Sequence, residues 1–150
     1  HVLGTEYEFT MPRMFRNMFM IAPDVKNDIF DKRNKGTFIS DSSRNVLVYY
    51  AGDDFVLSGS KLVHTVAFNF NRSLGHTGPH DMKNIPDNIW KVNCDEFNNT
   101  YDPLGHTYFL TSSSGEPHTA GVLFNHISQV LSTGRPAENS ENRHIRLRIS

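Results

Sequence analysis

The stretch from Leu62 to Phe70 restricts the possible folds of this 150-residue chain more than any other segment. Leu62, His64, Val66, Phe68 and Phe70 alternate with Val63, Thr65, Ala67 and Asn69, which is the two-residue period of a β-strand. The run from Val46 to Tyr50 is rich in β-branched and aromatic residues, and Gly, Asp and Ser separate it from the first. Together they predict consecutive strands of one sheet.

Further strands are predicted toward both ends of the chain. Ile145, Leu147 and Ile149 alternate with His144, Arg146 and Arg148, which predicts a closing edge strand with its apolar face inward and its basic face outward. Shorter strands are predicted at residues 108–110 and at residues 7–9. The chain is therefore expected to be mainly β.

Two segments leave the type of element open. Leu123, Ile127, Val130 and Leu131 have helical spacing, and the Gly at position 134 is a suitable helix stop, so one short helix near 121–132 is as compatible with the sequence as a strand. The Met-rich segment from residue 11 to residue 20 fits a short helix or a loop that fills the core.

Composition excludes several classes of protein. Hydrophobic residues make up 37% and charged residues 21% of the chain, which predicts a single folded domain over residues 1–150. A formal charge of -1 argues against nucleic acid as a partner, and no apolar run is long enough for a membrane span. Cys94 is the only cysteine, so an internal disulfide is impossible and a small buried side chain is expected. Glycosylation triplets at Asn71 and Asn98 predict an extracellular, secreted glycoprotein.

Classical serine or cysteine catalysis finds little support in the sequence. There is no Gly-x-Ser-x-Gly elbow, and Cys94 is followed by acidic residues that oppose thiolate formation. The paired carboxylates Asp53-Asp54 and Asp95-Glu96 are expected to be solvated turn residues. An enzyme is therefore the less favoured class.

Histidines are the most informative polar residues. His76 and His80 fall in one predicted loop, His106 just ahead of a predicted strand, and His118 in the loop after it. Neutral imidazole is a common ligand of copper and zinc, so histidines that converge from different loops predict a metal site. Exposed loop histidines without a ligand role are the alternative.

The order of motifs resembles a cupredoxin of the phytocyanin type. The segments that carry the resemblance are Asn69-Phe70, His80-Asp81-Met82, residues 90–94, residues 105–110 and residues 117–121. They cover about the C-terminal half, and the last strands are also similar to those of ephrin ectodomains. The resemblance implies an antiparallel β-sandwich with Greek key topology.

The resemblance also implies a site. His80 and His118 fall at the two histidine ligand positions, so we predict them as metal ligands. Thr111 stands where the ligand Cys would be, and Val122 is near the axial position, so a blue-copper centre is not expected.

The function predicted from these features is an extracellular, non-catalytic binding or recognition module with a degenerate copper site and a protein or glycan partner. One alternative is a His-ligated copper protein, which includes an oxygenase that chelates copper through His1 if that residue is a native N-terminus. The other alternative is a structural subunit of an oligomer or larger assembly.

Overall fold

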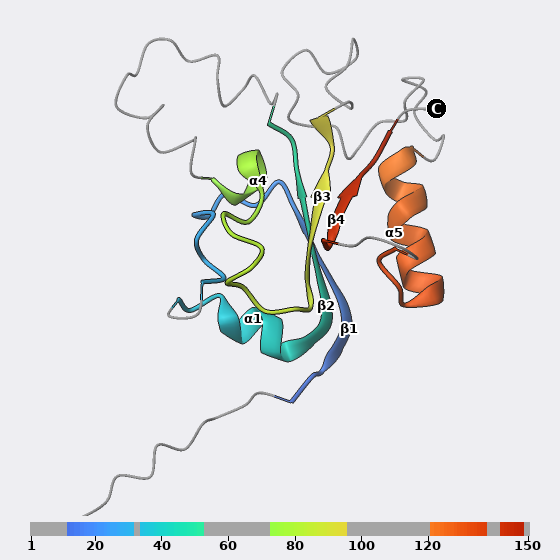
Figure 1. Cartoon of the computed structure of the whole chain (residues 1–150). Coiled ribbons are helices and arrows are strands. Elements are labelled where there is room, and N and C mark those ends of the chain that lie inside the picture. The colour runs from blue at the N-terminus through green and yellow to red at the C-terminus, as the bar shows by residue number, and fades with distance from the viewer. Residues whose placement is uncertain (1–11, 32–33, 53–72, 96–120, 138–141, 149–150) are drawn as a thin grey trace, which may run out of the picture.

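The computed structural model describes residues 12–31, 34–52, 73–95, 121–137 and 142–148 (Figure 1). Its elements in chain order are β1 (Phe15–Ile21), α1 (Thr37–Ser42), β2 (Ser43–Tyr50), α4 (Leu74–Thr77), β3 (Ile89–Asn93), α5 (Val122–Thr133) and β4 (His144–Arg146). The four strands form one sheet in the order β1-β2-β3-β4, and each neighbouring pair is parallel.

The predicted antiparallel β-sandwich with cupredoxin topology is therefore wrong. An antiparallel hairpin needs only a short turn. Each parallel pair here instead requires the chain to return from the carboxyl end of one strand to the amino end of the next. Helices lie on these crossings: α1 lies between β1 and β2, α4 between β2 and β3, and α5 between β3 and β4. The fold class is α/β.

The predictions for single strands and helices have mixed outcomes. The strand over Val46–Tyr50 is confirmed within β2, and residues 122–133 form the helix α5, which ends at Gly134 in the left-handed conformation. The Met-rich segment was predicted as a helix or loop but contains β1. Predicted strands at 62–70, 108–110 and 7–9 lie outside the described residues.

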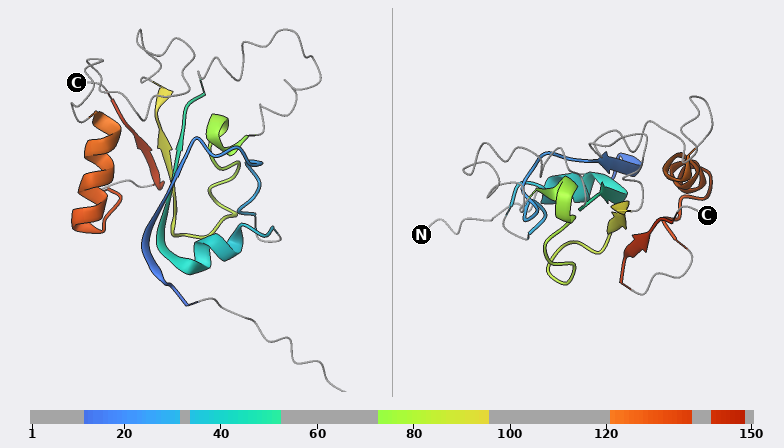
Figure 2. Two further views of the ribbon diagram at one scale, coloured as in Figure 1. Left: turned by 180° about the vertical axis from the view of Figure 1, so that it is seen from behind. Right: turned by 90° about the horizontal axis from the view of Figure 1, so that it is seen from above.

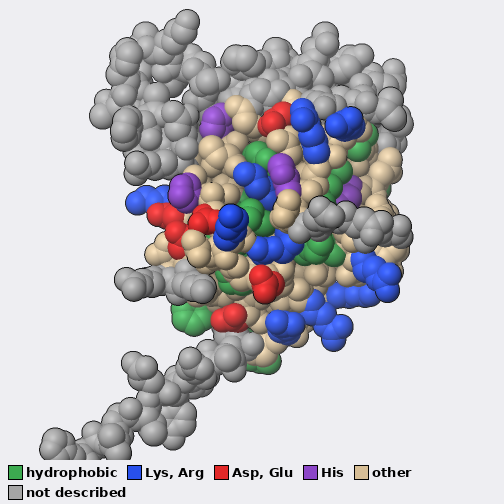
Figure 3. Space-filling view, in the orientation of Figure 1, with side chains coloured by type: hydrophobic (Ala, Val, Ile, Leu, Met, Phe, Trp, Pro, Cys, Tyr) green, Lys and Arg blue, Asp and Glu red, His purple; other side chains and the backbone are tan. Residues whose placement is uncertain are grey.

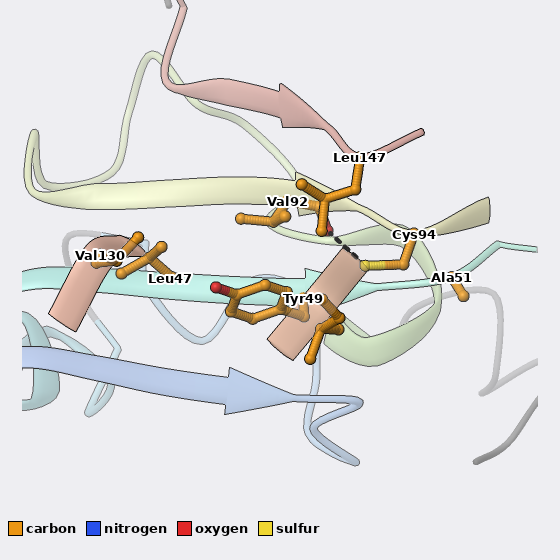
Figure 4. Close-up of a cluster of buried hydrophobic side chains, with 8 residues drawn as sticks. Leu47, Tyr49, Ala51, Val92, Cys94, Val130 and Leu147 are labelled. Carbon is orange, nitrogen blue, oxygen red and sulfur yellow. Dashed lines mark hydrogen bonds between the residues drawn. The ribbon is translucent and has the colours of Figure 1, made fainter. Parts of the chain in front are cut away.

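β2 is the centre of the core because both of its faces are buried. Leu47 and Tyr49 belong to a hydrophobic cluster under α5, which also contains Val92, Val130 and Leu147 (Figure 4). Val46 and Val48 point to the opposite face, where a second cluster packs under α1, α4 and the loops beside them; its other members are Phe30, Leu74, Ile85 and Ile89. Figures 1 and 2 show α5 on one side of the sheet and α1 with α4 on the other.

Cys94 is buried within the cluster under α5, as predicted for a small core side chain. Its thiol lies 3.9 Å from the carbonyl oxygen of Val92 (Figure 4). Within the described part of the chain, no helix has the length and apolar character needed to cross a membrane.

The loop after β1 is held against α4 at the end of the sheet to which the strands run. The amide of Gly75 donates to the carbonyl of Pro23 at 2.9 Å, and the amide of Leu74 donates to the carbonyl of Val25 at 2.7 Å. Ala22 turns the chain with a positive φ of 44°. A Cβ at Gly75 would lie only 2.7 Å from the carbonyl carbon of Ala22, so this contact requires glycine.

Replacing Gly75 with Ala is expected to lower the free energy of unfolding by about 1–3 kcal/mol, because the new methyl group meets backbone that cannot move freely. Urea unfolding followed by circular dichroism measures this. Gly52→Ala is the matched control, since its Cβ would have its nearest contacts at 3.4 and 3.5 Å. Equal stability of the two variants would contradict the proposed close packing.

Candidate functional site

Parallel strands bring all their carboxyl ends to one edge of the sheet, and ligands of open α/β sheets bind beyond that edge. On the face opposite α5, the side chains become polar toward this edge. Val48 is buried and precedes Tyr50 on β2, whereas β3 continues from the buried Ile89 to Lys91 and Asn93. In Figure 3, basic, acidic and histidine side chains gather over the ends of β3 and β4.

Five polar residues from three strands meet at this edge, and we call them the carboxyl-end cluster. They are Tyr50 of β2, Lys91 and Asn93 of β3, Asp95 just after β3, and His144 of β4. The parallel register places Tyr50 opposite Asn93 and Lys91 opposite His144, so the fold itself determines which of them are neighbours.

A chain of hydrogen bonds runs through the cluster. The Asn93 side-chain amide donates to an Asp95 carboxylate oxygen at 2.6 Å and to the Tyr50 hydroxyl at 3.1 Å. The Tyr50 hydroxyl lies 3.2 Å from Nε2 of His144. The hydroxyl accepts from Asn93 and keeps its own proton, which it can donate to Nε2 of His144.

Asp95 also links the ends of β2 and β3. Its Oδ1 accepts a hydrogen bond of 2.6 Å from the backbone amide of Gly52, and its own amide donates to the Asn93 side-chain oxygen at 2.9 Å. Both carboxylate oxygens are therefore engaged. The contact fixes the backbone at Gly52, immediately before the segment that begins with Asp53-Asp54.

Burial and neighbouring charges shift the pKa values of three side chains in the cluster. Burial lowers the pKa of the Lys91 ammonium, an effect that the charge of Asp95 partly offsets. Burial likewise lowers the pKa of His144, and the positive charges of Lys91 and Arg146 lower it further. The pKa of Tyr50 is raised, chiefly by burial, so its hydroxyl keeps its proton near neutral pH.

His126 of α5 is committed to the core. Its Nε2 lies 3.0 Å from the carbonyl oxygen of Pro136, which can only accept, so Nε2 carries the proton. Nδ1 then accepts from the hydroxyl of Tyr49 at 3.0 Å. Both nitrogens are occupied and the side chain is buried, so His126 holds α5 on the sheet and is not available for proton transfer.

His76 lies in α4, and its backbone oxygen is close to Gly52. Its Nδ1 is buried and has no hydrogen-bond partner among the described residues. The described contacts therefore leave this nitrogen unassigned.

The predicted metal ligands His80 and His118 are not brought together by anything in the described structure. His80 is exposed in the loop before β3, where its backbone amide donates to the carbonyl of Asn27, and His118 lies outside the described residues, as does His1. Among the residues that the structure describes, no group of three or more His, Cys, Asp or Glu side chains is arranged to hold a metal ion. Metal binding by His80 and His118 stays a prediction, without the cupredoxin frame that suggested it.

Sequence patterns missed most of the cluster. Tyr50 belongs to an apolar run, and Asp95 was expected to be a solvated turn residue, yet it is bonded to Gly52 across 43 positions of sequence. Of the basic residues near the C-terminus, Arg143 donates to the carbonyl oxygens of Met82 and Pro86, whereas His144 joins the cluster. The only local signal was the position of polar residues directly after apolar runs.

Comparison with known proteins gives one match. The model of a family described as alpha/beta hydrolase of unknown function (DUF900) matches residues 2–118. No curated protein and no solved structure matches the chain significantly. The match agrees with the parallel sheet, and it contradicts both the resemblance to cupredoxins and the predicted non-catalytic module with a degenerate copper site.

Replacing Asp95 with Ala is expected to lower the free energy of unfolding by about 1–2 kcal/mol, because it removes a charged acceptor from Gly52 and Asn93. Amide exchange at Gly52 should accelerate in the same variant. Asp87→Ala is the control, since the Asp87 side chain is fully exposed. Unchanged exchange at Gly52 would show that Asp95 does not hold this backbone.

The lowered pKa of His126 predicts a specific dependence of stability on pH. The unfolded chain takes up a proton near pH 6.5, whereas folded His126 does so only at lower pH, so the free energy of unfolding falls as the pH drops below about 6.5. The slope from this one group is at most about 1.4 kcal/mol per pH unit.

His126→Gln should be less stable than the unsubstituted protein at pH 8, and the difference should shrink toward pH 5. Chemical unfolding across this range measures both quantities. Parallel pH profiles for the two proteins would contradict the assignment.

Proposed function

Since the chain belongs to the alpha/beta hydrolase family described as DUF900, we propose that it supplies the acid and the histidine of a hydrolytic active site at the carboxyl edge of its sheet. The observation that carries this proposal is the contact between Asp95 and Gly52, which fixes the end of β2 at that edge. The reaction class is hydrolysis of an ester bond through nucleophile, histidine and acid.

The order of the residues along the chain identifies the candidates. In α/β hydrolases the catalytic residues follow one another as serine, acid and histidine. Asp53 and Asp54 follow β2 after two residues, and His106 and His118 follow β3, so an acid and a histidine occur in the required order. We therefore assign the acid to the pair Asp53-Asp54 and the base to His106 or His118.

The other acids and histidines at this edge are less suited. Both oxygens of Asp95 accept hydrogen bonds from its neighbours, and both nitrogens of His126 are occupied in the core. His144 has one ring nitrogen engaged by the Tyr50 hydroxyl. Their hydrogen bonds make these groups structural.

The serine nucleophile is not assigned to this sequence. No Gly-x-Ser-x-Gly elbow occurs in it, and the three serines at the α1–β2 junction lie at the opposite edge of the sheet. Ser42 and Ser43 are buried there and bonded to the carbonyl of Ile39. The proposal is thus confined to the acid and the histidine.

In the proposed reaction the carboxylate orients the imidazole, which accepts the proton of the nucleophilic hydroxyl as that oxygen attacks the ester carbonyl. The same imidazole then protonates the leaving alkoxide. A water molecule then attacks the acyl-enzyme in the same way, which releases the carboxylic acid product and restores the nucleophilic hydroxyl. None of these steps changes the oxidation state of any group.

The test is hydrolysis of p-nitrophenyl esters by the complete gene product that contains this sequence. His106→Gln and His118→Gln are compared, and loss of the catalytic histidine should lower kcat by about 10³-fold or more with little change in KM. Asp53→Asn and Asp54→Asn identify the acid in the same way.

His80→Gln and Asp87→Asn are matched controls, because both residues are exposed and neither is assigned to the site. They should retain the activity of the unsubstituted protein. Hydrolysis that survives all four substitutions at the candidate positions would refute the proposal.

A further inference from the structure

We propose that Lys91, together with His144 and Arg146, forms a binding site for a small oxyanion, that is, a carboxylate or phosphate group, at the carboxyl edge of the sheet. The site stands on the geometry of these residues. The further claim, that the bound oxyanion is part of the substrate, rests on the hydrolase function proposed above.

The first argument is the placement of two cationic side chains and one imidazole. Lys91 and His144 are opposite one another in register, and Arg146 is opposite Asn93, so the three side chains occupy neighbouring positions on one face of β3 and β4. His144 and Arg146 are exposed, and Lys91 is half-buried. A ligand can reach all three from the solvent side of the sheet.

The second argument is that the Lys91 ammonium has a ring beneath it but no paired carboxylate in the described structure. Its Nζ lies 4.8 Å from the centroid of the Tyr50 ring. Asp95 is the acid of the cluster, and its two carboxylate oxygens accept from Gly52 and Asn93. A half-buried ammonium in this position is stabilised by an anion that approaches from outside.

The third argument is that the surroundings hold Lys91 in place. The Tyr50 ring stacks with His144 at a centroid distance of 6.5 Å, and its hydroxyl is fixed by Asn93 and His144. Gly78, with a φ of +68°, leaves the space beside them: a Cβ there would lie 2.7 Å from Cε of Lys91 and 3.0 Å from the Tyr50 ring. The aromatic support of the ammonium is therefore formed before any ligand arrives.

A purely structural role for Lys91 explains less. A cation over a tyrosine contributes only about 0.5–1 kcal/mol at a partly exposed position. It involves neither His144 nor Arg146 of the adjacent strand, although both lie beside Lys91 in the register. An oxyanion between them interacts favourably with all three groups.

The site also suits a hydrolase whose substrate is acidic. It adjoins the end of β2, from which the proposed catalytic acid follows after two residues. A carboxylate or phosphate held by Lys91 would position a neighbouring ester bond over the same edge of the sheet. We therefore infer an ester with an anionic group as the substrate class.

The test is titration of the protein with sodium phosphate and, separately, with sodium acetate, with sodium chloride at matched ionic strength as the reference. Nuclear magnetic resonance of the histidine ring protons and the lysine ammonium reports where each anion binds. We expect saturable shifts at His144 and Lys91 with at least one of the two oxyanions, and none with chloride. Absence of saturable shifts with both oxyanions, or shifts centred elsewhere, would overturn the proposal.

Lys91→Gln should weaken the binding by about tenfold or more, because glutamine keeps a polar side chain, one atom shorter, and removes its charge. Lys83→Gln is the matched control, since Lys83 is exposed in the loop before β3, and it should leave the affinity unchanged within about twofold. Unaltered affinity in Lys91→Gln would refute the role of Lys91. The unsubstituted titration decides the question if that variant does not fold.

The two proposals fail separately. Oxyanion binding is measured without hydrolysis, so its absence removes the substrate class and leaves the assignment of the acid and histidine intact. Binding that is lost in Lys91→Gln, in a protein that hydrolyses no ester, would keep the site and remove its connection with hydrolysis.

Discussion

The burial of β2 on both faces is the constraint on which the rest of the structure depends. A strand with apolar side chains on both sides must be covered twice, and α5 covers one face while α1, α4 and their loops cover the other. Covering both faces with helices places them on the crossings between strands, which makes the strands parallel. Parallel strands then bring their polar ends to one edge, so the position of the candidate site follows from how β2 is buried.

Local patterns in the sequence carried part of this fold. Val46–Tyr50 was recognisable as a strand, and Gly134 correctly marked the end of α5. The direction of the strands was not recognisable, because the two-residue period is the same in parallel and antiparallel sheets. The decisive feature was that Val46–Tyr50 is apolar at every position, which is typical of a strand covered on both faces and not of a sandwich strand with one solvated face.

β1 and β3 were missed for different physical reasons. β1 consists largely of Met and Phe without regular alternation, and Met fits helices, strands and loops alike. β3 is short and carries Lys91 and Asn93 on one face, so its apolar character is interrupted. β1 is a strand because it pairs with β2, and β3 because it pairs with β2 and β4. A pairing partner that is far away in the sequence leaves no local signal.

The candidate site was even less accessible from the sequence, because its contacts join distant positions. Tyr50 contacts His144 across 94 residues, and Gly52 contacts Asp95 across 43. The histidine pattern suggested a metal centre because loop histidines were assumed to converge, whereas the described histidines are divided among separate roles. His126 is fixed in the core, His144 is hydrogen-bonded to Tyr50, and His80 is exposed.

The carboxyl-end cluster connects stability with the proposed chemistry. Asp95 and Asn93 use their hydrogen bonds to hold Gly52 and Tyr50, which leaves the positive charge of Lys91 without a fixed partner on the same strand. A close ion pair at this place would engage the charge of Lys91 within the protein and leave less of it for a ligand. Within the described residues, the carboxylate of the cluster positions backbone while the lysine lies over the Tyr50 ring, and this division of roles is the one that the proposed anion site requires.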